Sequence, residues 1–94
     1  MYLISYDIAS NRLRTKLAKK LLNYGKRVQY SVFECDINRI VFRKCYEEMM
    51  ELIDGQSEVS IRCYVIDKTA QGKMILLGDP EYILSDIAED VIFI

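Results

Sequence analysis

The apolar positions of this chain change period along its length, and each change marks the boundary of a predicted element. Residues 2–7 are mostly apolar and end in a carboxylate, which predicts a short strand. The following apolar residues recur every three to four positions and predict a helix to about residue 24. Ser10 or Asn11 can cap its start, and Gly25 suits its end. The predicted buried stripe of this helix consists of Leu13, Leu17, Leu21 and Tyr24.

The middle of the chain predicts extended structure followed by a second helix. Residues 27–37 are rich in Val, Tyr and Phe, and form either one bent strand or two short strands meeting near residues 31–33. Asn38 is placed to cap a helix that runs to about residue 54, with Gly55 beyond it. The predicted buried face of this helix consists of Phe42, Cys45, Tyr46, Met49 and Ile53.

The last third begins with a clear two-residue alternation. Residues 58–67 place apolar side chains on one side and a mixed set on the other, which predicts a strand covered on both faces or facing a partner. Residues 68–73 read as a polar loop and residues 74–77 as a short strand. An acidic stretch follows and ends in the apolar residues 91–94.

This order of elements predicts an α+β fold, a ferredoxin-like sandwich whose antiparallel sheet carries two helices on one face. We assign residues 1–80 to this domain and residues 81–94 to a C-terminal tail or strand for contact with a dimer mate or another partner. The open sheet face needs a cover, and a homodimer is the simplest one. Residues 91–94 then either add a strand to the partner subunit or pack on their own sheet.

Composition and charge sharpen this picture. Apolar residues make up 51% of the chain, which favours some apolar burial against another subunit. Residues 1–46 carry ten Lys or Arg and three acids, whereas residues 47–94 carry three and eleven, so a net charge of −1 hides halves of +7 and −8. Such asymmetry suggests a surface for a polyanion, unless the two signs intermix in space.

Cysteine content and hydropathy indicate in which cellular compartment the protein is expected. The three cysteines are widely spaced and the chain contains no histidine, so neither a zinc site nor a disulfide framework is indicated. No apolar run reaches the length of a membrane span. We therefore expect a cytoplasmic protein that does not associate with a membrane.

Asp7 is the first candidate for chemistry. A lone aspartate after a strand most often hydrogen-bonds the following turn. Alternatively, it binds Mg²⁺ or Mn²⁺, since Mg²⁺ uses one or two carboxylates completed by water and substrate phosphates. A two-fold axis would supply a second Asp7, and bound metal would acidify a water in a chain that lacks histidine as a general base.

The basic residues of the first half are the second candidate. They are either a solvated helix face or a phosphate-binding surface, and their concentration in one half favours the latter. Tyr6, Tyr30 and Phe33 either stack on bases or, as is commoner for aromatics in strands, belong to the core or an interface. The predicted nucleic-acid-binding set is Arg12, Arg14, Lys16, Lys19, Lys20 and Arg27.

Several of these segments together resemble one protein family. They are Tyr6-Asp7-Ile8, the basic helix, the stretch Val-Gln-Tyr-Ser-Val-Phe-Glu at 28–34, and the capped helix after it. The chain resembles, over about residues 2–78, the second of the two universal CRISPR adaptation proteins, the small CRISPR-associated endonuclease that accompanies the spacer integrase. Where relatives often carry further acids after Tyr-Asp-Ile, this chain has Ala9-Ser10-Asn11, which leaves Asp7 with less local help.

The resemblance implies a ferredoxin-like homodimer with Asp7 of each chain facing the two-fold axis to hold a divalent metal, Mg²⁺ or Mn²⁺. It implies metal-dependent cleavage of single-stranded RNA or double-stranded DNA, and also a role as the bridge of an integrase complex. The alternative is a non-catalytic scaffold that binds DNA and bridges integrase subunits, and the two roles can coexist. In the scaffold, charge reversal at Arg14 and Lys16, or removal of residues 82–94, would block spacer acquisition. The implied functional positions are Tyr6, Asp7, Arg14, Lys16, Arg27 and Phe33.

Overall fold

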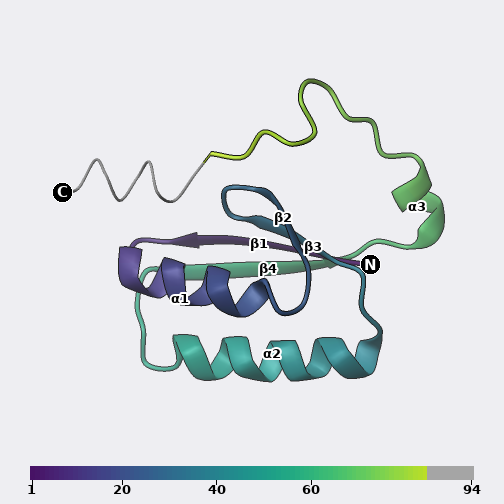
Figure 1. Cartoon of the computed structure of the whole chain (residues 1–94). Coiled ribbons are helices and arrows are strands. Elements are labelled where there is room, and N and C mark those ends of the chain that lie inside the picture. The colour runs from purple at the N-terminus through teal and green to yellow at the C-terminus, as the bar shows by residue number, and fades with distance from the viewer. Residues whose placement is uncertain (85–94) are drawn as a thin grey trace.

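The computed structural model describes residues 1–84, which form a four-stranded antiparallel sheet with two long helices on one face (Figure 1). The strand order is β2-β3-β1-β4, which confirms the predicted ferredoxin-like α+β fold. In chain order the elements are β1 (Tyr2–Ile8), α1 (Asn11–Leu21), β2 (Lys26–Gln29), β3 (Val32–Cys35), α2 (Arg39–Ile53), β4 (Val59–Val65) and α3 (Lys68–Gly72).

Helix α1 begins as predicted and ends earlier than predicted. The Ser10 side chain accepts a hydrogen bond from the Leu13 backbone N–H at 3.2 Å, which caps the first turn. The expected continuation to residue 24 is wrong, because the backbone N–H groups of Asn23 and Tyr24 bond to carbonyls three residues back, at 3.1 and 2.9 Å. This tightening ends the helix at Leu21, with Leu22 as the C-cap residue.

The extended middle segment forms two strands, the second of the two alternatives drawn from the sequence. Strands β2 and β3 pair as a hairpin whose register shifts between Arg27 and Gln29. The turn between the strands is tied to the central strand, because the Tyr6 backbone N–H donates to the Ser31 carbonyl at 3.1 Å. A short turn with an irregular register therefore explains how one apolar run supplies two strands.

Helix α2 starts at its predicted cap, where Asn38 Oδ1 accepts from the Val41 N–H at 2.9 Å. Cys45 and Met49 are buried as expected. Tyr46 is 48% exposed, so its assignment to the buried face is wrong. A helix has room for only a narrow buried stripe against a sheet, and Tyr46 lies beside that stripe.

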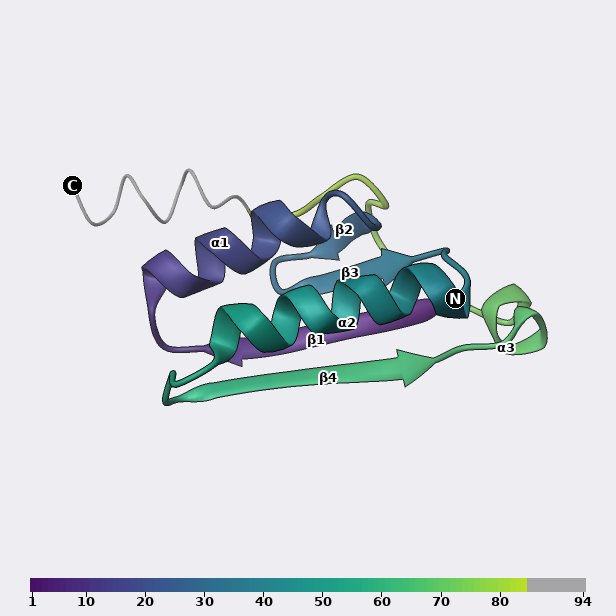
Figure 2. The same cartoon turned by 90° about the horizontal axis from the view of Figure 1, so that it is seen from below.

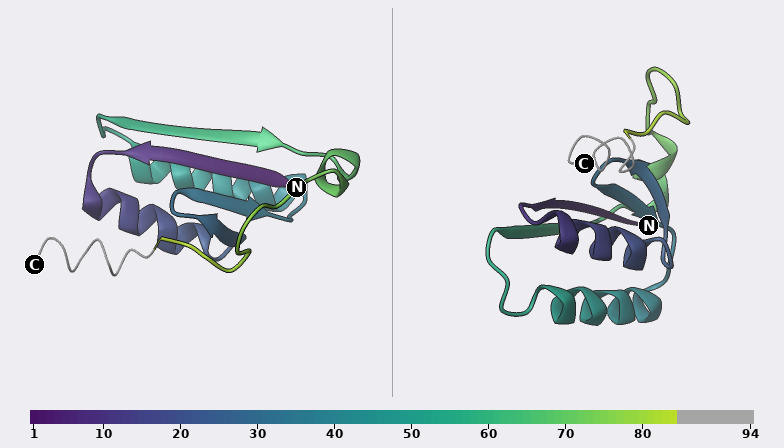
Figure 3. Two further views of the ribbon diagram at one scale, coloured as in Figure 1. Left: turned by 90° about the horizontal axis from the view of Figure 1, so that it is seen from above. Right: turned by 60° about the vertical axis from the view of Figure 1, so that its left-hand side comes forward.

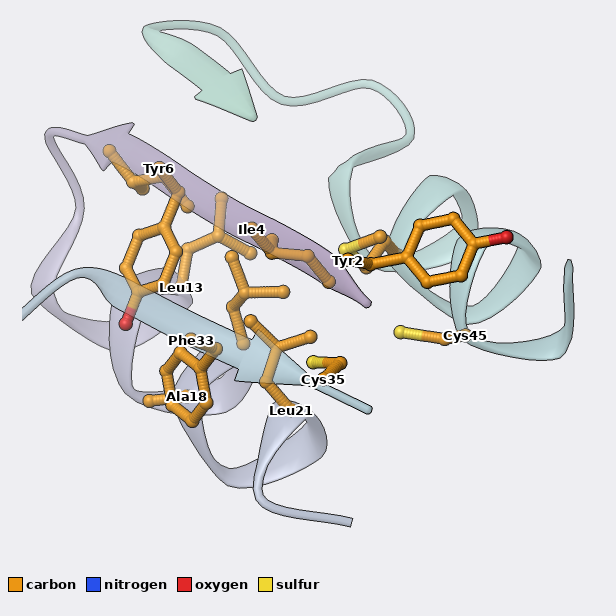
Figure 4. Close-up of a cluster of buried hydrophobic side chains, with 12 residues drawn as sticks. Tyr2, Ile4, Tyr6, Leu13, Ala18, Leu21, Phe33, Cys35 and Cys45 are labelled. Carbon is orange, nitrogen blue, oxygen red and sulfur yellow. The ribbon is translucent and has the colours of Figure 1, made fainter. Parts of the chain in front are cut away.

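Strand β1 is the centre of the core, and its side chains alternate strictly. Tyr2, Ile4, Tyr6 and Ile8 are buried against the two helices, whereas the residues between them lie on the opposite face. Figure 2 shows both helices on the same side of the sheet, and Figure 4 shows the side chains that fill the space between the layers. Four of the fully buried residues come from different elements, namely Ile4, Leu17, Phe33 and Cys45.

The segment after β4 differs from the sequence-based expectation. The predicted polar loop contains helix α3, which begins where Asp67 Oδ1 accepts from the Ala70 N–H at 2.8 Å. The predicted strand over residues 74–77 is wrong for the described chain: Ile75 and Leu77 are 83% and 90% exposed, and no described strand pairs with them. An apolar segment becomes a strand only when another strand satisfies its backbone groups. Residues 81–84 contain no helix or strand, and residues 91–94 lie outside the described part.

Close packing at Gly25 generates a stability prediction. A Cβ at this position would lie 2.5 Å from Cys35 Sγ and from the Glu34 carbonyl oxygen. Gly25→Ala is therefore expected to lower the free energy of unfolding by about 1–3 kcal/mol in chemical denaturation, because a backbone carbonyl cannot move aside cheaply. Gly72→Ala is the control, since a Cβ there meets nothing within 4 Å. Equal stability of the two variants would contradict this packing.

Candidate nucleic-acid and metal site

Asp7 lies near the end of β1, on the sheet face that carries no helix. It is exposed, and its neighbours Tyr6 and Ile8 are buried on the helix face. In the register with β4, Asp7 stands opposite Ser60, and Ser5 stands opposite Arg62. The carboxylate is therefore available to a ligand or a second molecule approaching the open face.

The open face is a mixed surface rather than a purely polar one. Leu3 is half-buried and stands opposite the exposed Tyr64 of β4 and opposite Glu34 of β3. The right-hand view of Figure 3 shows both long helices on the other side of the sheet. Arg62 shares this face with Asp7 but was not among the predicted site residues. The alternation of residues 58–67 shows which side of the strand carries Arg62, and only the register with β1 places it opposite Ser5.

Arg14 holds the turn that follows Asp7. Its Nη1 donates to the Ile8 carbonyl at 2.7 Å and to the Ala9 carbonyl at 3.4 Å. Arg14 itself is half-buried in α1. The side chain thus reaches the end of β1, and the contact makes Arg14 a positioning residue for the β1–α1 turn.

Arg27 is the cation of a small aromatic cluster on the helix face. Its guanidinium carbon lies 5.3 Å from the Tyr30 ring centroid and 5.7 Å from that of Phe33. The Arg27 Nε donates to the Tyr30 carbonyl at 2.8 Å, and Nη2 donates to the same oxygen. The Tyr6 and Phe33 rings stack with centroids 6.3 Å apart. The cluster fixes the β2–β3 turn beside β1.

The structure therefore divides the predicted site residues between two faces. Asp7 is on the open face, whereas Tyr6, Arg27 and Phe33 belong to the helix face, since Arg27 is the register partner of Phe33. Tyr6 and Phe33 are 4% and 0% exposed, so their rings are core groups in this structure, which is the commoner of the two roles considered for them. Arg14 lies on α1 and donates a hydrogen bond to the Ile8 carbonyl, directly after Asp7 at the end of β1.

The basic face of α1 is partly neutralised. Lys20 Nζ lies 3.6 Å from Glu48 Oε1 of α2, so opposite charges do meet at one point. Burial together with the hydrogen bond from Tyr24 Oη to Glu48 Oε2, 2.8 Å long, raises the pKa of Tyr24 to about 12. The remaining predicted cations of this helix, Arg12, Lys16 and Lys19, are exposed.

Two of the three cysteines are core residues, and the third, Cys63, is exposed. Cys35 and Cys45 are free and buried, and burial raises the pKa of the Cys35 thiol to about 11 and that of Cys45 to about 12. Neutral thiols are poor nucleophiles and metal ligands.

Within residues 1–84 no three His, Cys, Asp or Glu side chains come together to hold a metal ion. Likewise, no helix in this part is long and apolar enough to cross a membrane.

Comparisons with known proteins agree on one family. A family model described as "CRISPR associated protein Cas2" matches residues 1–74. A protein from Chloroflexus aurantiacus named "CRISPR-associated endoribonuclease Cas2 1" is 37% identical over 83% of this chain and 84% of the relative. A Synechocystis protein named "CRISPR-associated endoribonuclease Cas2 3" is 34% identical over 85% and 86%.

Solved structures support the same relationship. The crystal structure of Streptococcus pyogenes Cas2 matches with a TM-score of 0.71 and 32% identity, over 82% of this chain and 98% of that one. A hypothetical protein from Thermus thermophilus matches with a TM-score of 0.73 and 32% identity, over 86% and 93%. The similarity in fold and the similarity in sequence therefore indicate the same family.

The carbonyl contacts of Arg14 generate a prediction that separates positioning from substrate binding. Arg14→Ala is expected to lower the free energy of unfolding by about 1.5–3 kcal/mol, because it removes hydrogen bonds from a charged donor to partly buried carbonyls. Lys16→Ala, which removes an exposed cation from the same helix, is expected to change it by less than about 0.5 kcal/mol. Urea denaturation measures both; equal values would contradict a positioning role for Arg14.

Proposed function

The chain belongs to the Cas2 family of CRISPR-associated proteins, and on that premise we propose that it is a metal-dependent endonuclease that works with the integrase in spacer acquisition. The observation that carries the nuclease is the exposed Asp7 carboxylate on the helix-free face of the sheet, directly before the turn held by Arg14. Relatives named endoribonucleases support RNA as one substrate. Single-stranded RNA and double-stranded DNA are the two substrates proposed.

Asp7 would hold the metal, Mg²⁺ or Mn²⁺. A carboxylate is a hard oxygen ligand that suits these ions, and a site with one protein carboxylate per chain fits Mg²⁺, which keeps several waters and uses substrate phosphate oxygens. When bound, the ion would acidify a water and stabilise charge on the phosphate. The uncovered face around Leu3 and Tyr64 supports a homodimer that brings a second Asp7 to the site.

The other residues of the site have supporting roles in this proposal. Arg14 holds the backbone after Asp7, so that the carboxylate stays at the strand end. Lys16 is exposed on the same helix and would bind a substrate phosphate. Arg27 would anchor the nucleic-acid strand, while the Phe33 ring beneath its guanidinium and the Tyr6 ring stacked on Phe33 would shape the site.

A second candidate function is a non-catalytic scaffold that grips DNA and bridges integrase subunits. The exposed cations Arg12, Lys16 and Lys19 on α1 favour it, because a duplex is held mainly through its phosphates. The single carboxylate per chain also favours it, since within residues 1–84 no cluster of metal ligands forms. The cytoplasm is the expected location for either role.

The nuclease proposal is tested by Asp7→Asn, which keeps the shape of the side chain and removes its charge. Cleavage of labelled single-stranded RNA and duplex DNA by the purified protein is expected to require Mg²⁺ or Mn²⁺ and to fall about 10²-fold or more in the variant, as when a group that stabilises transition-state charge is removed. EDTA should abolish it. Gel-resolved initial rates are the measurement.

Asp36→Asn is the matched control for that experiment. Asp36 is also exposed and directly follows a strand, but Cys35 before it pairs with Tyr2, at the opposite end of β1 from Asp7. The cleavage rate of this variant should equal that of the wild type. Absence of wild-type cleavage, or equal cleavage by Asp7→Asn, would reject the nuclease and leave the scaffold.

The scaffold predicts a salt-dependent interaction between Lys16 and a DNA phosphate. Lys16→Glu is expected to weaken duplex DNA binding uniformly across sequences and to reduce the slope of log affinity against log salt concentration by about 0.9 for each phosphate that is no longer neutralised. Fluorescence anisotropy at several salt concentrations measures this slope. Lys73→Glu, in the exposed segment after α3, should leave the slope unchanged; equal effects of the two reversals would argue against a specific grip by α1.

A further inference from the structure

A pocket of about 620 Å³ opens beside the first turns of α2, away from the residues assigned above. Its wall combines three rings, Tyr2, Phe42 and Tyr46, with the charged residues Arg39, Arg43 and Glu47. Asp7 is five residues further along β1 than Tyr2 and on the opposite face of the sheet, about 17 Å away at a rise of about 3.4 Å per residue. The pocket is therefore a separate place on the molecule.

The three rings form a stepped wall that leads from the core to solvent. Tyr2 and Phe42 stack with centroids 3.9 Å apart and planes within 2° of parallel, and the Tyr46 ring follows at 6.5 Å from Phe42, tilted by 41°. Tyr2 is buried, Phe42 half-buried and Tyr46 half-exposed. Exposed aromatic faces in a hollow are suited to a flat ring, because every nucleobase has a face that stacks.

The charged side chains around this wall suit the binding of a nucleotide better than they suit the stability of helix α2. Arg39 and Arg43 are exposed one turn apart in the first half of α2, and the first turn contains no acid. A cation in the first turn of a helix opposes the macrodipole and costs stability, so Arg39 is not explained by the fold, and Arg43 lies one turn further along beside it. Added to the positive helix end, they make a site for phosphate.

Glu47 supplies the remaining contact. Its carboxylate lines the same pocket one turn after Arg43 and can accept hydrogen bonds from the ring N–H and amino groups of a base. An acidic peptide would satisfy the arginines but would leave the stacked rings unmatched and would offer Glu47 no ring N–H or amino donors. A base in a duplex cannot enter, since its faces are covered by its neighbours.

We propose that this pocket binds one unpaired nucleotide, with its base against Phe42 and Tyr46, its phosphate at Arg39 and Arg43, and its Watson–Crick edge at Glu47. Such a site would capture a single-stranded end or overhang, whereas the basic face of α1 suits the backbone of a longer nucleic acid. Binding in this pocket does not depend on catalysis at Asp7.

The test is an NMR titration of the isotope-labelled full chain with guanosine 5′-monophosphate, uridine 5′-monophosphate and ribose 5-phosphate. The largest shifts are expected at Ile40, Phe42 and Tyr46, and ribose 5-phosphate should bind at least about fivefold more weakly, since stacking of one base typically contributes a factor of about five to a hundred. Glu47→Gln should reduce the preference for guanosine over uridine monophosphate.

Two variants and two controls complete the design. Tyr46→Ala and Arg43→Gln are each expected to weaken guanosine monophosphate binding at least about fivefold. Met50→Ala, also half-exposed and one turn further along α2 but outside the pocket, should bind as the wild type. Asp7→Asn should bind normally even where cleavage is abolished, which keeps this result independent of the nuclease.

Three outcomes of the nucleotide titrations would overturn the proposal. They are equal affinity for ribose 5-phosphate and the nucleotides, unchanged binding by both pocket variants, and shifts that map to α1 instead of α2. Tighter binding of a glutamate-rich peptide than of the nucleotides would also reject it and would identify the surface as a protein contact.

Discussion

The alternation of side chains along β1 is the constraint on which the rest of the structure depends. This strand lies between β3 and β4 and has helices on one face only, so every second residue must enter the core. A shift of one residue in its pairing would move Asp7 into the core and Tyr6 out of it. The register that buries Tyr2, Ile4, Tyr6 and Ile8 is therefore the same register that exposes Asp7, and stability of the core also fixes the candidate site.

The same constraint explains why the candidate site is divided within one chain. Phe33 is the register partner of Ile4 and enters the core with it, and Arg27 follows Phe33 to the helix face. Asp7 takes the other face, so the two sets are separated by the sheet itself. Arg14 is the side chain that reaches from α1 to the end of the strand. A second molecule on the open face, as in the proposed homodimer, would bring its own Asp7 to this carboxylate, whereas Arg27 and Phe33 stay on the helix side of the sheet.

Local signals allowed much of the fold to be predicted, and non-local pairing explains what was missed. Ser10 and Asn38 cap the two helices as expected, because a capping side chain acts within three residues of itself. Residues 74–77 have the composition of a strand but no described strand to pair with, and sequence cannot show whether a partner exists. Asp7 and Arg14 could be singled out from their positions, whereas the placing of Arg62 on the same sheet face as Asp7 needed the register of β4. Tyr46 was assigned to the core because its position fits the spacing of apolar residues along the helix. A helix packed on a sheet buries a stripe of side chains narrower than that spacing suggests, and Tyr46 lies outside it.

The basic and the acidic half of the sequence meet within one helix, α2. Helix α2 carries Arg39, Arg43 and Lys44 in its first half and Glu48, Glu51 and Asp54 toward or beyond its end, so its charges run against its own dipole. In the first and last turns, where Arg39, Glu51 and Asp54 lie, each exposed charge of the wrong sign costs about 0.3–1 kcal/mol, and a sequence selected for stability alone would reverse it. Glu48 recovers part of this cost through Lys20 and Tyr24 of α1. Arg39 opposes the dipole from the first turn, and with Arg43 it lies beside three rings, which is why this end of the helix points to a ligand rather than to packing.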